Sequence, residues 1–157
     1  MLKNKALFLD RDGVINVEKN YVHKISEFEF IPEIFGILKK YQEEGFLIFV
    51  VTNQAGIARN YYTEEDVIRL NNWMVEKLRQ KGIVISGVYY CPHHPDISGE
   101  CECRKPKPGM ILKAIKEYNI NPEQSVLIGD KESDIQAGLN AKIGKNIFFQ
   151  DLLKQNS

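Results

Sequence analysis

Short runs of apolar residues, each long enough for one β-strand, alternate along this chain with segments of helical period. One of them, residues 46–51, reads Phe-Leu-Ile-Phe-Val-Val and contains no polar side chain. Strands that are apolar on both faces are typical of a parallel sheet with helices on both sides, and right-handed crossovers make such a sheet doubly wound. We therefore predict an α/β fold with a mainly parallel sheet. The expected strands cover 5–9, 46–51, 83–90, 124–128 and 143–149.

The segments between the predicted strands carry helix signals. Thr63 is a good N-cap and precedes three acidic residues, and apolar residues then recur at helical spacing as far as Gly82. Helices are also expected over 32–45 and 110–118, and from Ser133 or Asp134 onward. Residues 13–31 lack a clear period and are expected to form loops. The length of 157 residues predicts a single domain, 1–157.

Each unusual polar cluster follows directly after a predicted strand. Asp10 and Asp12 follow the first strand, Thr52 the second, Cys91 the third and Asp130 the fourth. The carboxyl ends of parallel strands share one edge of the sheet, and ligands bind in the crevice there. We therefore expect these segments to converge on one site.

Asp10 and Asp12 are the strongest sign of chemistry. Both side chains can face the same side of an extended chain, where two carboxylates repel each other unless a cation or a reaction uses them; a solvated acidic turn is the alternative. With Asp130 they form an oxygen-rich set that suits Mg²⁺, and Thr52 and Lys105 offer a donor and a positive charge to an anion. Such a combination is typical of phosphoryl transfer.

Two further patterns bear on this hypothesis. Asp134 lies four residues after Asp130 and could support the cation site from a helix, or could simply cap that helix. The chain contains neither G-x-x-x-x-G-K-[ST] nor G-x-G-x-x-G, so nucleoside triphosphate or dinucleotide binding is not supported. Hydrolysis of a phosphate ester requires neither motif.

The charge balance gives no reason to expect a polyanionic partner. The chain has 21 basic and 21 acidic residues and a formal net charge of zero, which disfavours the alternative of a zinc-stabilised nucleic-acid-binding module. No apolar run approaches the ~18 residues of a membrane span, and three clustered cysteines do not resemble a secreted disulfide framework. We expect a cytoplasmic monomer that acts on a small molecule.

All three cysteines fall in one short segment. Cys91, Cys101 and Cys103, with His93, provide three sulfurs and an imidazole, enough for one tetrahedral Zn²⁺; unrelated thiols beside a histidine are the alternative. The loop 91–103 is too polar to form its own core, and a structural zinc would offset the entropy of ordering it. Its expected role is to aim the basic residues that follow. His94 has no assigned role; we expect it to be exposed or to face the substrate and not to be a fifth ligand.

Four segments resemble the motifs of the haloacid-dehalogenase-like phosphatases and occur in that family's order. They are residues 10–14 (Asp-Arg-Asp-Gly-Val), 51–54 (Val-Thr-Asn-Gln), 104–106 (Arg-Lys-Pro) and 129–134 (Gly-Asp-Lys-Glu-Ser-Asp). Longer runs at 9–16, 52–59 and 91–95 are similar to those of a subgroup, the D,D-heptose 1,7-bisphosphate phosphatases and the related histidinol-phosphate phosphatases. The resemblance extends from 8 to 138 and implies the same fold. Phosphatases of this superfamily often carry a cap domain between the first and second or the second and third motifs, but no such insertion fits here, so we expect no cap domain.

The resemblance implies a role for each motif residue. Asp10 is the expected nucleophile, which forms an aspartyl-phosphate, and Asp12 the general acid that then becomes a general base. Thr52 and Lys105 are expected to stabilise the transferring phosphoryl group. The expected metal ligands are Asp10, Asp130 and the Asp12 backbone carbonyl for Mg²⁺, and Cys91, His93, Cys101 and Cys103 for Zn²⁺. The expected substrate contacts are Glu18, Lys19, Asn20, Tyr21, Thr52, Asn53, Gln54, Ala55, Arg104, Lys105 and Lys131.

The subgroup also implies a substrate. The leading hypothesis is removal of the 7-phosphate from a heptose 1,7-bisphosphate, in the nucleotide-heptose route to lipopolysaccharide or another surface polysaccharide; histidinol phosphate is the alternative. Both leave the catalytic residues unchanged, so only the walls of the cleft discriminate. A bisphosphate requires a second anion site, for which Lys19, Arg59 and Arg104 are candidates.

Overall fold

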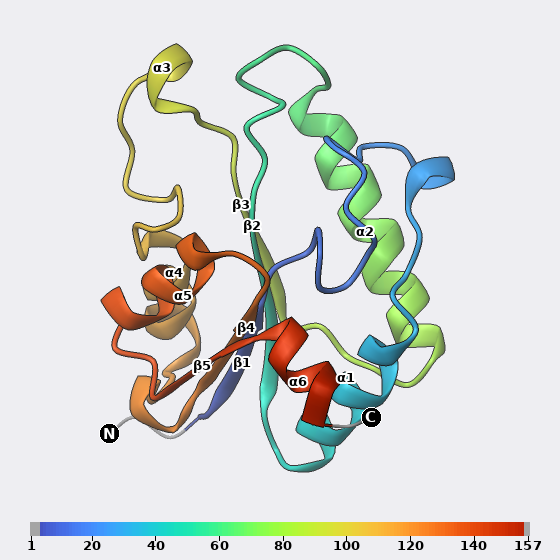
Figure 1. The fold of residues 1–157 in the computed structure, drawn as a ribbon, viewed down its shortest axis with the longest axis vertical. Coiled ribbons are helices and arrows are strands. Elements are labelled where there is room, and N and C mark those ends of the chain that lie inside the picture. The colour runs from blue at the N-terminus through green and yellow to red at the C-terminus, as the bar shows by residue number, and fades with distance from the viewer. Residues whose placement is uncertain (1–3, 156–157) are drawn as a thin grey trace.

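One five-stranded sheet forms the centre of the protein, as a computed structural model that describes residues 4–155 shows (Figure 1). The strands lie in the order β3-β2-β1-β4-β5, and every pair of neighbours is parallel. Their bounds are β1 Ala6–Leu9, β2 Leu47–Asn53, β3 Gly87–Cys91, β4 Val126–Gly129 and β5 Lys145–Phe148.

Helices cover both faces of this sheet (Figure 1). One face packs against α1 (Glu33–Glu43), α2 (Glu64–Gln80) and α6 (Phe149–Gln155), and the other against α4 (Gly109–Tyr118) and α5 (Glu132–Asn140). A short helix, α3 (Pro95–Ser98), lies after β3, and the 3-10 turns cover Ile25–Glu27 and Pro122–Gln124. The predicted doubly wound α/β fold is confirmed.

The apolar strand residues divide between two cores. In β1, Leu7 and Leu9 belong to the core under α1 and α2, whereas Ala6 and Phe8 belong to the core under α4 and α5. All four side chains are fully buried. Successive strand residues point to opposite faces, so a strand with helices on both sides has no position for an exposed polar residue.

All five strands begin one to four residues later in the structure than the sequence suggests, and the third shows the largest difference. The third begins at Gly87, because the backbone before it forms hydrogen bonds with the side chain of Gln42 in α1. Gln42 Nε2 donates to Gly82 O at 2.8 Å, and Gln42 Oε1 accepts from Val84 N at 2.7 Å. The fourth begins at Val126, after the Pro122–Gln124 turn. The last strand ends at Phe148, and α6 follows it, a helix that the sequence analysis did not predict.

The strand order reverses between β1 and β4. The chain forms β1, β2 and β3 in one direction and then returns to add β4 and β5 on the other side of β1. Asp10 N donates to Ile128 O at 3.4 Å, which keeps the end of β1 level with β4. The loops that follow these two strands diverge here, which leaves room for a ligand at the carboxyl edge.

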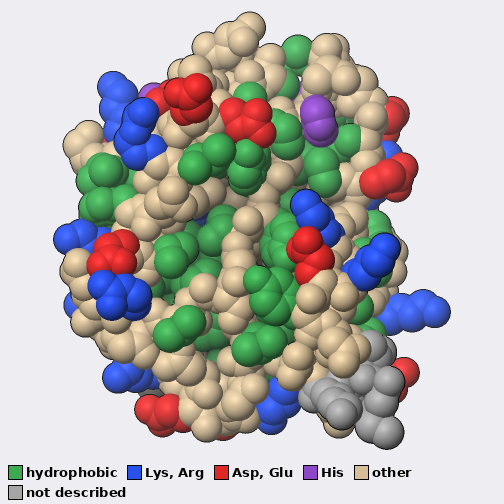
Figure 2. Space-filling view, turned by 180° about the vertical axis from the view of Figure 1, so that it is seen from behind, with side chains coloured by type: hydrophobic (Ala, Val, Ile, Leu, Met, Phe, Trp, Pro, Cys, Tyr) green, Lys and Arg blue, Asp and Glu red, His purple; other side chains and the backbone are tan. Residues whose placement is uncertain are grey.

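Figure 2 shows the molecule from behind, with hydrophobic side chains across the middle of that face and charged ones mainly around its rim. Basic and acidic side chains stand close to one another there, in agreement with the formal net charge of zero. Of the helices in residues 4–155, none combines the length and the hydropathy that a membrane span requires.

Candidate active site

A cleft of about 390 Å³ opens at the carboxyl edge of the sheet and contains most of the predicted site. The predicted residues that line it are Asp10, Asp12, Glu18, Asn20, Tyr21, Asn53, Gln54, Ala55, Arg104, Lys105 and Lys131. Three others that were predicted, Lys19, Thr52 and Asp130, are not among its lining residues. Lys19 turns to Glu29, with Nζ 3.1 Å from Oε1. Thr52 is fully buried behind the cleft, and its Oγ1 accepts from Gln54 Nε2 at 2.9 Å.

At the base of the cleft a buried lysine pairs with two carboxylates. Lys105 Nζ lies 3.1 Å from Asp10 Oδ1 and 2.5 Å from Asp134 Oδ1, and it also donates to Val51 O at 2.9 Å. Burial lowers the pKa of Lys105, but the charges of Asp10 and Asp134 outweigh this effect and raise it above its ordinary value. Lys105 is therefore a fixed positive charge beside Asp10.

Asp10 lies among more negative than positive charge. Burial raises its pKa to about 7; Lys105 opposes this, while the carboxylates of Asp134, Asp12 and Asp130 add to it. The Asp10 side chain is 9% exposed, and its Oδ1 also accepts from Arg11 N at 2.9 Å. A cation at this position would favour the ionised, nucleophilic form of Asp10.

The carboxylate oxygens around Asp10 are suitable ligands for such a cation. Carboxylate oxygens of Asp10, Asp130 and Asp134 lie within 4.8 Å of one another. Asp130 Oδ1 is buried without a hydrogen-bond partner among the described residues, and burial, with the charge of Asp134 added, raises the pKa of Asp130 to about 6. Hard oxygen donors with excess negative charge suit Mg²⁺. Asp134, which the sequence analysis left open, thus joins the predicted ligands Asp10 and Asp130.

Two features shape this carboxylate cluster. Asp134 Oδ2 accepts from the backbone N of Asp130 at 3.1 Å and of Lys131 at 3.2 Å, so Asp134 caps the start of α5 and also contacts the site. Gly13 has φ +92°, and a Cβ there would overlap the Asp130 carboxylate. The glycine after Asp12 is therefore needed both for its backbone conformation and for the room that it leaves.

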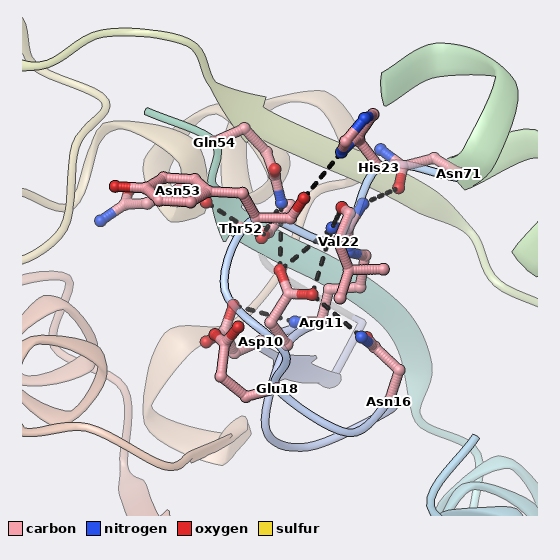
Figure 3. Close-up of polar contacts among 12 residues, drawn as sticks. Asp10, Arg11, Asn16, Glu18, Val22, His23, Thr52, Asn53, Gln54 and Asn71 are labelled. Atoms are coloured by element: carbon pink, nitrogen blue, oxygen red, sulfur yellow. Dashed lines mark hydrogen bonds and ion pairs between the residues drawn. The ribbon is translucent and has the colours of Figure 1, made fainter. Parts of the chain in front are cut away.

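The carboxylate of Asp12 is held apart from this cluster by four hydrogen bonds. Arg11 Nη2 lies 3.1 Å from each of its oxygens, Asn16 Nδ2 donates to Oδ1 at 2.9 Å, and Gln54 Nε2 donates to Oδ2 at 3.2 Å. Arg11 is fully buried; its Nη1 donates to Asn71 Oδ1 of α2 at 3.1 Å, and its Nη2 to Val22 O at 2.7 Å. Figure 3 shows Arg11 between Asp10, Asn71 and Val22.

The orientation of Gln54 depends on Tyr62. Burial raises the pKa of Tyr62 to about 12, so its hydroxyl stays protonated and donates to Gln54 Oε1 at 2.6 Å. The amide nitrogen of Gln54 must then face Asp12 and Thr52, as Figure 3 shows for Thr52. Gly56 makes this possible, because a Cβ there would overlap the Tyr62 ring.

Asn53 contacts neither Asp12 nor any other carboxylate. Its Oδ1 accepts from Lys105 N at 3.0 Å, and its Nδ2 donates to Lys105 O at 3.4 Å. Asp12 is oriented instead by Arg11, Asn16 and Gln54. Asn53 positions the backbone of Lys105, and thereby the ammonium group beside Asp10.

The three cysteines converge beside the cleft. Cys91 and Cys103 form a disulfide, and Cys101 Sγ lies 3.6 Å from Cys91 Sγ and 3.7 Å from Cys103 Sγ. The sulfurs form a group that, when reduced, could hold a metal ion. His93, the fourth predicted ligand, is outside this group: its ring nitrogens do not lie within 4.8 Å of all three sulfurs. Its carbonyl accepts from Arg104 Nη1 at 3.4 Å.

Several residues of the site carry no strong signal in the sequence. Tyr62 and Ser133 line the cleft without having been predicted there. His94 and Arg59 line it too; a substrate-facing position was one expectation for His94, and Arg59 was a candidate for a second anion site. Asn71 stands on the buried stripe of α2 beside Leu70 and Met74. A polar residue on an apolar helical face is a sign that it has a partner in the core, and Asn71 could have been found in this way.

Comparisons with known proteins agree with this geometry. A family model described as HAD-hydrolase-like matches residues 102–145. The D-glycero-beta-D-manno-heptose-1,7-bisphosphate 7-phosphatase of Haemophilus influenzae is 46% identical over 151 residues, which cover 94% of this chain and 82% of that protein. The D-glycero-alpha-D-manno-heptose-1,7-bisphosphate 7-phosphatase of Campylobacter jejuni is 48% identical over 154 residues, which cover 98% and 87%.

A solved structure shows the same similarity in three dimensions. The D,D-heptose 1,7-bisphosphate phosphatase of B. bronchiseptica, in complex with magnesium and phosphate, superposes with a TM-score of 0.79 at 26% identity. The match covers 96% of this chain and 99% of that one.

Proposed function

Because the chain belongs to the heptose-1,7-bisphosphate 7-phosphatase family of HAD-like hydrolases, we propose that it removes the 7-phosphate from a D-glycero-D-manno-heptose 1,7-bisphosphate. It is a phosphomonoesterase, and the sugar 1-phosphate and inorganic phosphate are its products. The observation that carries this proposal is the position of Asp10: a carboxylate at the carboxyl end of β1, in the cleft, with Lys105 Nζ at 3.1 Å.

Asp10 is the nucleophile. Its carboxylate oxygen attacks phosphorus, the bond to the sugar oxygen breaks, and an aspartyl-phosphate forms. Lys105 stabilises the charge on the phosphoryl oxygens as the transfer proceeds. This role is supported by the position of its ammonium group, which is fixed between Asp10, Asp134 and Val51 O and needs no rearrangement to meet an anion at Asp10.

Asp12 moves the protons. It donates a proton to the departing sugar oxygen, and it then accepts one from the water that attacks the aspartyl-phosphate and releases phosphate. The four contacts to its carboxylate all come from N–H donors, so they describe the ionised form, which is the form that accepts a proton in the second step. Thr52 acts on Asp12 indirectly. Its Oγ1 accepts a hydrogen bond from Gln54 Nε2, and the same nitrogen donates to Asp12, so Thr52 helps to orient the Gln54 amide.

Asp10, Asp130 and Asp134 are the side chains that would hold Mg²⁺, with the Asp12 backbone carbonyl as the further ligand proposed from the sequence. Bound there, the ion supplies positive charge that offsets the negative charge of the transferring phosphoryl group. The unpartnered Asp130 Oδ1 supports this assignment, as does the magnesium in the B. bronchiseptica relative.

The cysteine cluster would hold Zn²⁺ in a structural role when its thiols are reduced. Three sulfurs within reach of one ion support this, and His93 would have to turn toward them to complete the tetrahedron. The cluster is continuous with Arg104 and Lys105, so ordering it orders the side of the cleft that binds substrate.

The substrate assignment is tested by phosphate release from the heptose 1,7-bisphosphate and from histidinol phosphate, each with and without Mg²⁺. We expect kcat/KM for the heptose bisphosphate to exceed that for histidinol phosphate by at least about a hundredfold, a difference of about 2.7 kcal/mol. Phosphorus NMR of the product should show a sugar that retains its 1-phosphate. A preference for histidinol phosphate would overturn the assignment and leave the catalytic roles intact.

A further inference from the structure

On the β3 side of the cleft, two side chains that the mechanism does not use face each other. Arg59 Nη2 lies 3.3 Å from His94 Nε2, and both residues line the same cleft as Asp10. Arg59 follows β2, and His94 follows β3. The two segments are joined at their start, where Gln54 N donates to Cys91 O at 2.8 Å.

The contacts of His94 Nδ1 indicate which ring nitrogen carries the proton. His94 Nδ1 lies 3.2 Å from Asp96 N, which can only donate, so Nδ1 accepts. In a neutral imidazole the proton is then on Nε2, and it points at the guanidinium of Arg59. The opposite tautomer would let Nε2 accept from Arg59 but would set a donor against the Asp96 amide. In either form one ring nitrogen faces another donor, at 3.3 Å for Nε2 or 3.2 Å for Nδ1; in the second form the nearest acceptor for Nδ1–H is Asp96 Oδ2 at 3.8 Å.

Arg59 has a second unsatisfied donor. Its Nε is buried and has no hydrogen-bond partner within the part of the chain that the structure describes. The backbone around it is fixed, since Arg59 N donates to Ala55 O at 3.1 Å and Tyr61 N to Gly56 O at 2.9 Å. Buried donors without acceptors cost free energy that a bound anion would recover.

The position of this pair relative to Asp10 suits a substrate with an anion at each end. Asp10 follows β1, and β2 and β3 lie on the side of β1 away from Asp130. Neighbouring strands are about 4.8 Å apart, so two spacings place the loop after β3 ~10 Å from the end of β1. That distance is within reach of a sugar with phosphates at its two ends.

We propose that Arg59 and His94 bind the phosphate that is not transferred, through the guanidinium and Nε2–H. This inference rests on the proposed function and names two residues that determine its specificity. Of the other two candidates, Lys19 pairs with Glu29 outside the cleft, whereas Arg104 lines the cleft and donates to His93 O. A cationic amine, such as that of histidinol phosphate, would meet like charge at Arg59, so the pair also selects against it.

The test is a comparison of two substrates, the heptose 1,7-bisphosphate and the heptose 7-phosphate, which differ only in the distal phosphate. Arg59→Met should lower kcat/KM for the bisphosphate by about tenfold to a hundredfold and change that for the monophosphate by less than about threefold. Arg69→Met is the matched control, because Arg69 is exposed on α2 and pairs with Asp66. In this variant kcat/KM should stay unchanged for both substrates.

Substitutions of His94 separate its two nitrogens. His94→Asn keeps an acceptor where Nδ1 caps α3 and removes the Nε2 donor, so it should lose most of the preference for the bisphosphate. His94→Gln keeps a donor at the position of Nε2 and should retain that preference. Arg59→Met combined with His94→Asn should lose less than the product of the two single effects, since both act on one phosphate.

The outcomes distinguish this inference from the proposed function. If Arg59→Met and His94→Asn change kcat/KM equally for the bisphosphate and the monophosphate, or change neither, then Arg59 and His94 do not bind the distal phosphate. If the wild-type enzyme does not hydrolyse the heptose bisphosphate, the proposed function is wrong, and the same variants are compared on fructose 1,6-bisphosphate and fructose 6-phosphate. If the variants leave the ratio of kcat/KM for these two fructose phosphates unchanged, the assignment of Arg59 and His94 to a distal phosphate is overturned as well.

Discussion

The ammonium group of Lys105 lies 3.1 Å from Asp10 Oδ1 and pairs with Asp134 at the same time, in a site where all three side chains are nearly fully buried. One positive charge thus holds two carboxylates at the end of β1. Its removal should both weaken the fold and remove the charge that meets the phosphoryl group.

Lys105→Met should reduce kcat by at least about a hundredfold and destabilise the metal-free protein by about 3–5 kcal/mol, because two buried carboxylates lose their partner. Mg²⁺ should restore part of this stability. The control is Lys107→Met, because the ion pair of Lys107 with Glu100 is exposed and contributes little to stability. Urea unfolding with and without Mg²⁺ measures the effect; equal losses in both variants would contradict it.

Asp10→Asn should lower steady-state turnover by at least about 10⁴-fold, because an amide oxygen cannot form the aspartyl-phosphate. The protein should still fold, since Asn keeps the shape of the side chain and removes a charge that is unfavourable when buried. Circular dichroism checks the fold and phosphate release the rate. Appreciable turnover in this variant would exclude Asp10 as the nucleophile.

Asn71→Ala tests whether α2 positions the catalytic loop through Arg11. The guanidinium would lose its Nη1 partner while buried, and we expect a cost of about 1–3 kcal/mol and a fall in kcat of about tenfold with little change in KM. Asn72→Ala is the neighbouring control, on the exposed side of the same helix. If both substitutions leave kcat unchanged, Arg11 does not depend on Asn71 for its position.

The stability of the metal-free protein should fall as the pH rises. Asp10 ionises near its ordinary value of 3.8 in the unfolded chain but only at about 7 in the folded one, where burial holds the proton. Between these values the folded state binds more protons than the unfolded state, so the free energy of unfolding decreases with pH. Asp130, with its pKa raised to about 6, adds to this trend.

The measurement is urea unfolding in EDTA from pH 4 to pH 8. Asp10→Asn should flatten the curve, because an amide does not titrate. Saturating Mg²⁺ should flatten or reverse it as well, since the ion favours the ionised carboxylates. A curve of the same slope in both proteins would show that Asp10 does not keep its proton in the folded state.

Zinc content tests the cysteine cluster. Protein purified under reducing conditions should contain about one zinc per chain, Cys101→Ser should lose most of it, and Ser98→Ala on the same loop should not. The contrary result would be a protein without zinc that shows a single reactive thiol when it is unfolded without reductant. The cysteine cluster would then contain the Cys91–Cys103 disulfide and a free Cys101 instead of a metal ion.

The sequence predicts the layers of this fold and the centre of the site because both depend on strong local signals. Apolar strand runs fix the sheet, and the positions after strands place Asp10 and Asp130 at one edge. The bounds of β3 are set by a long-range side-chain contact from Gln42, which no local pattern reports.

The walls of the site are harder to predict for a similar reason. Asn53 and Gln54 are adjacent, yet one contacts the Lys105 backbone and the other Asp12, because successive residues at the end of β2 point in different directions. The pairing of Arg59 with His94 depends on how two loops meet beyond β2 and β3. Such contacts follow from the tertiary structure.

The reversal of strand order between β1 and β4 also has a consequence for how the protein is made. β1 is synthesised before β4, and β2, β3 and the whole cysteine loop separate these two neighbours in the sequence. Pairing across such a long stretch of chain comes late in folding. Two of the three carboxylates of the candidate metal site, Asp130 and Asp134, follow β4, so the site is complete only after β4 has paired with β1.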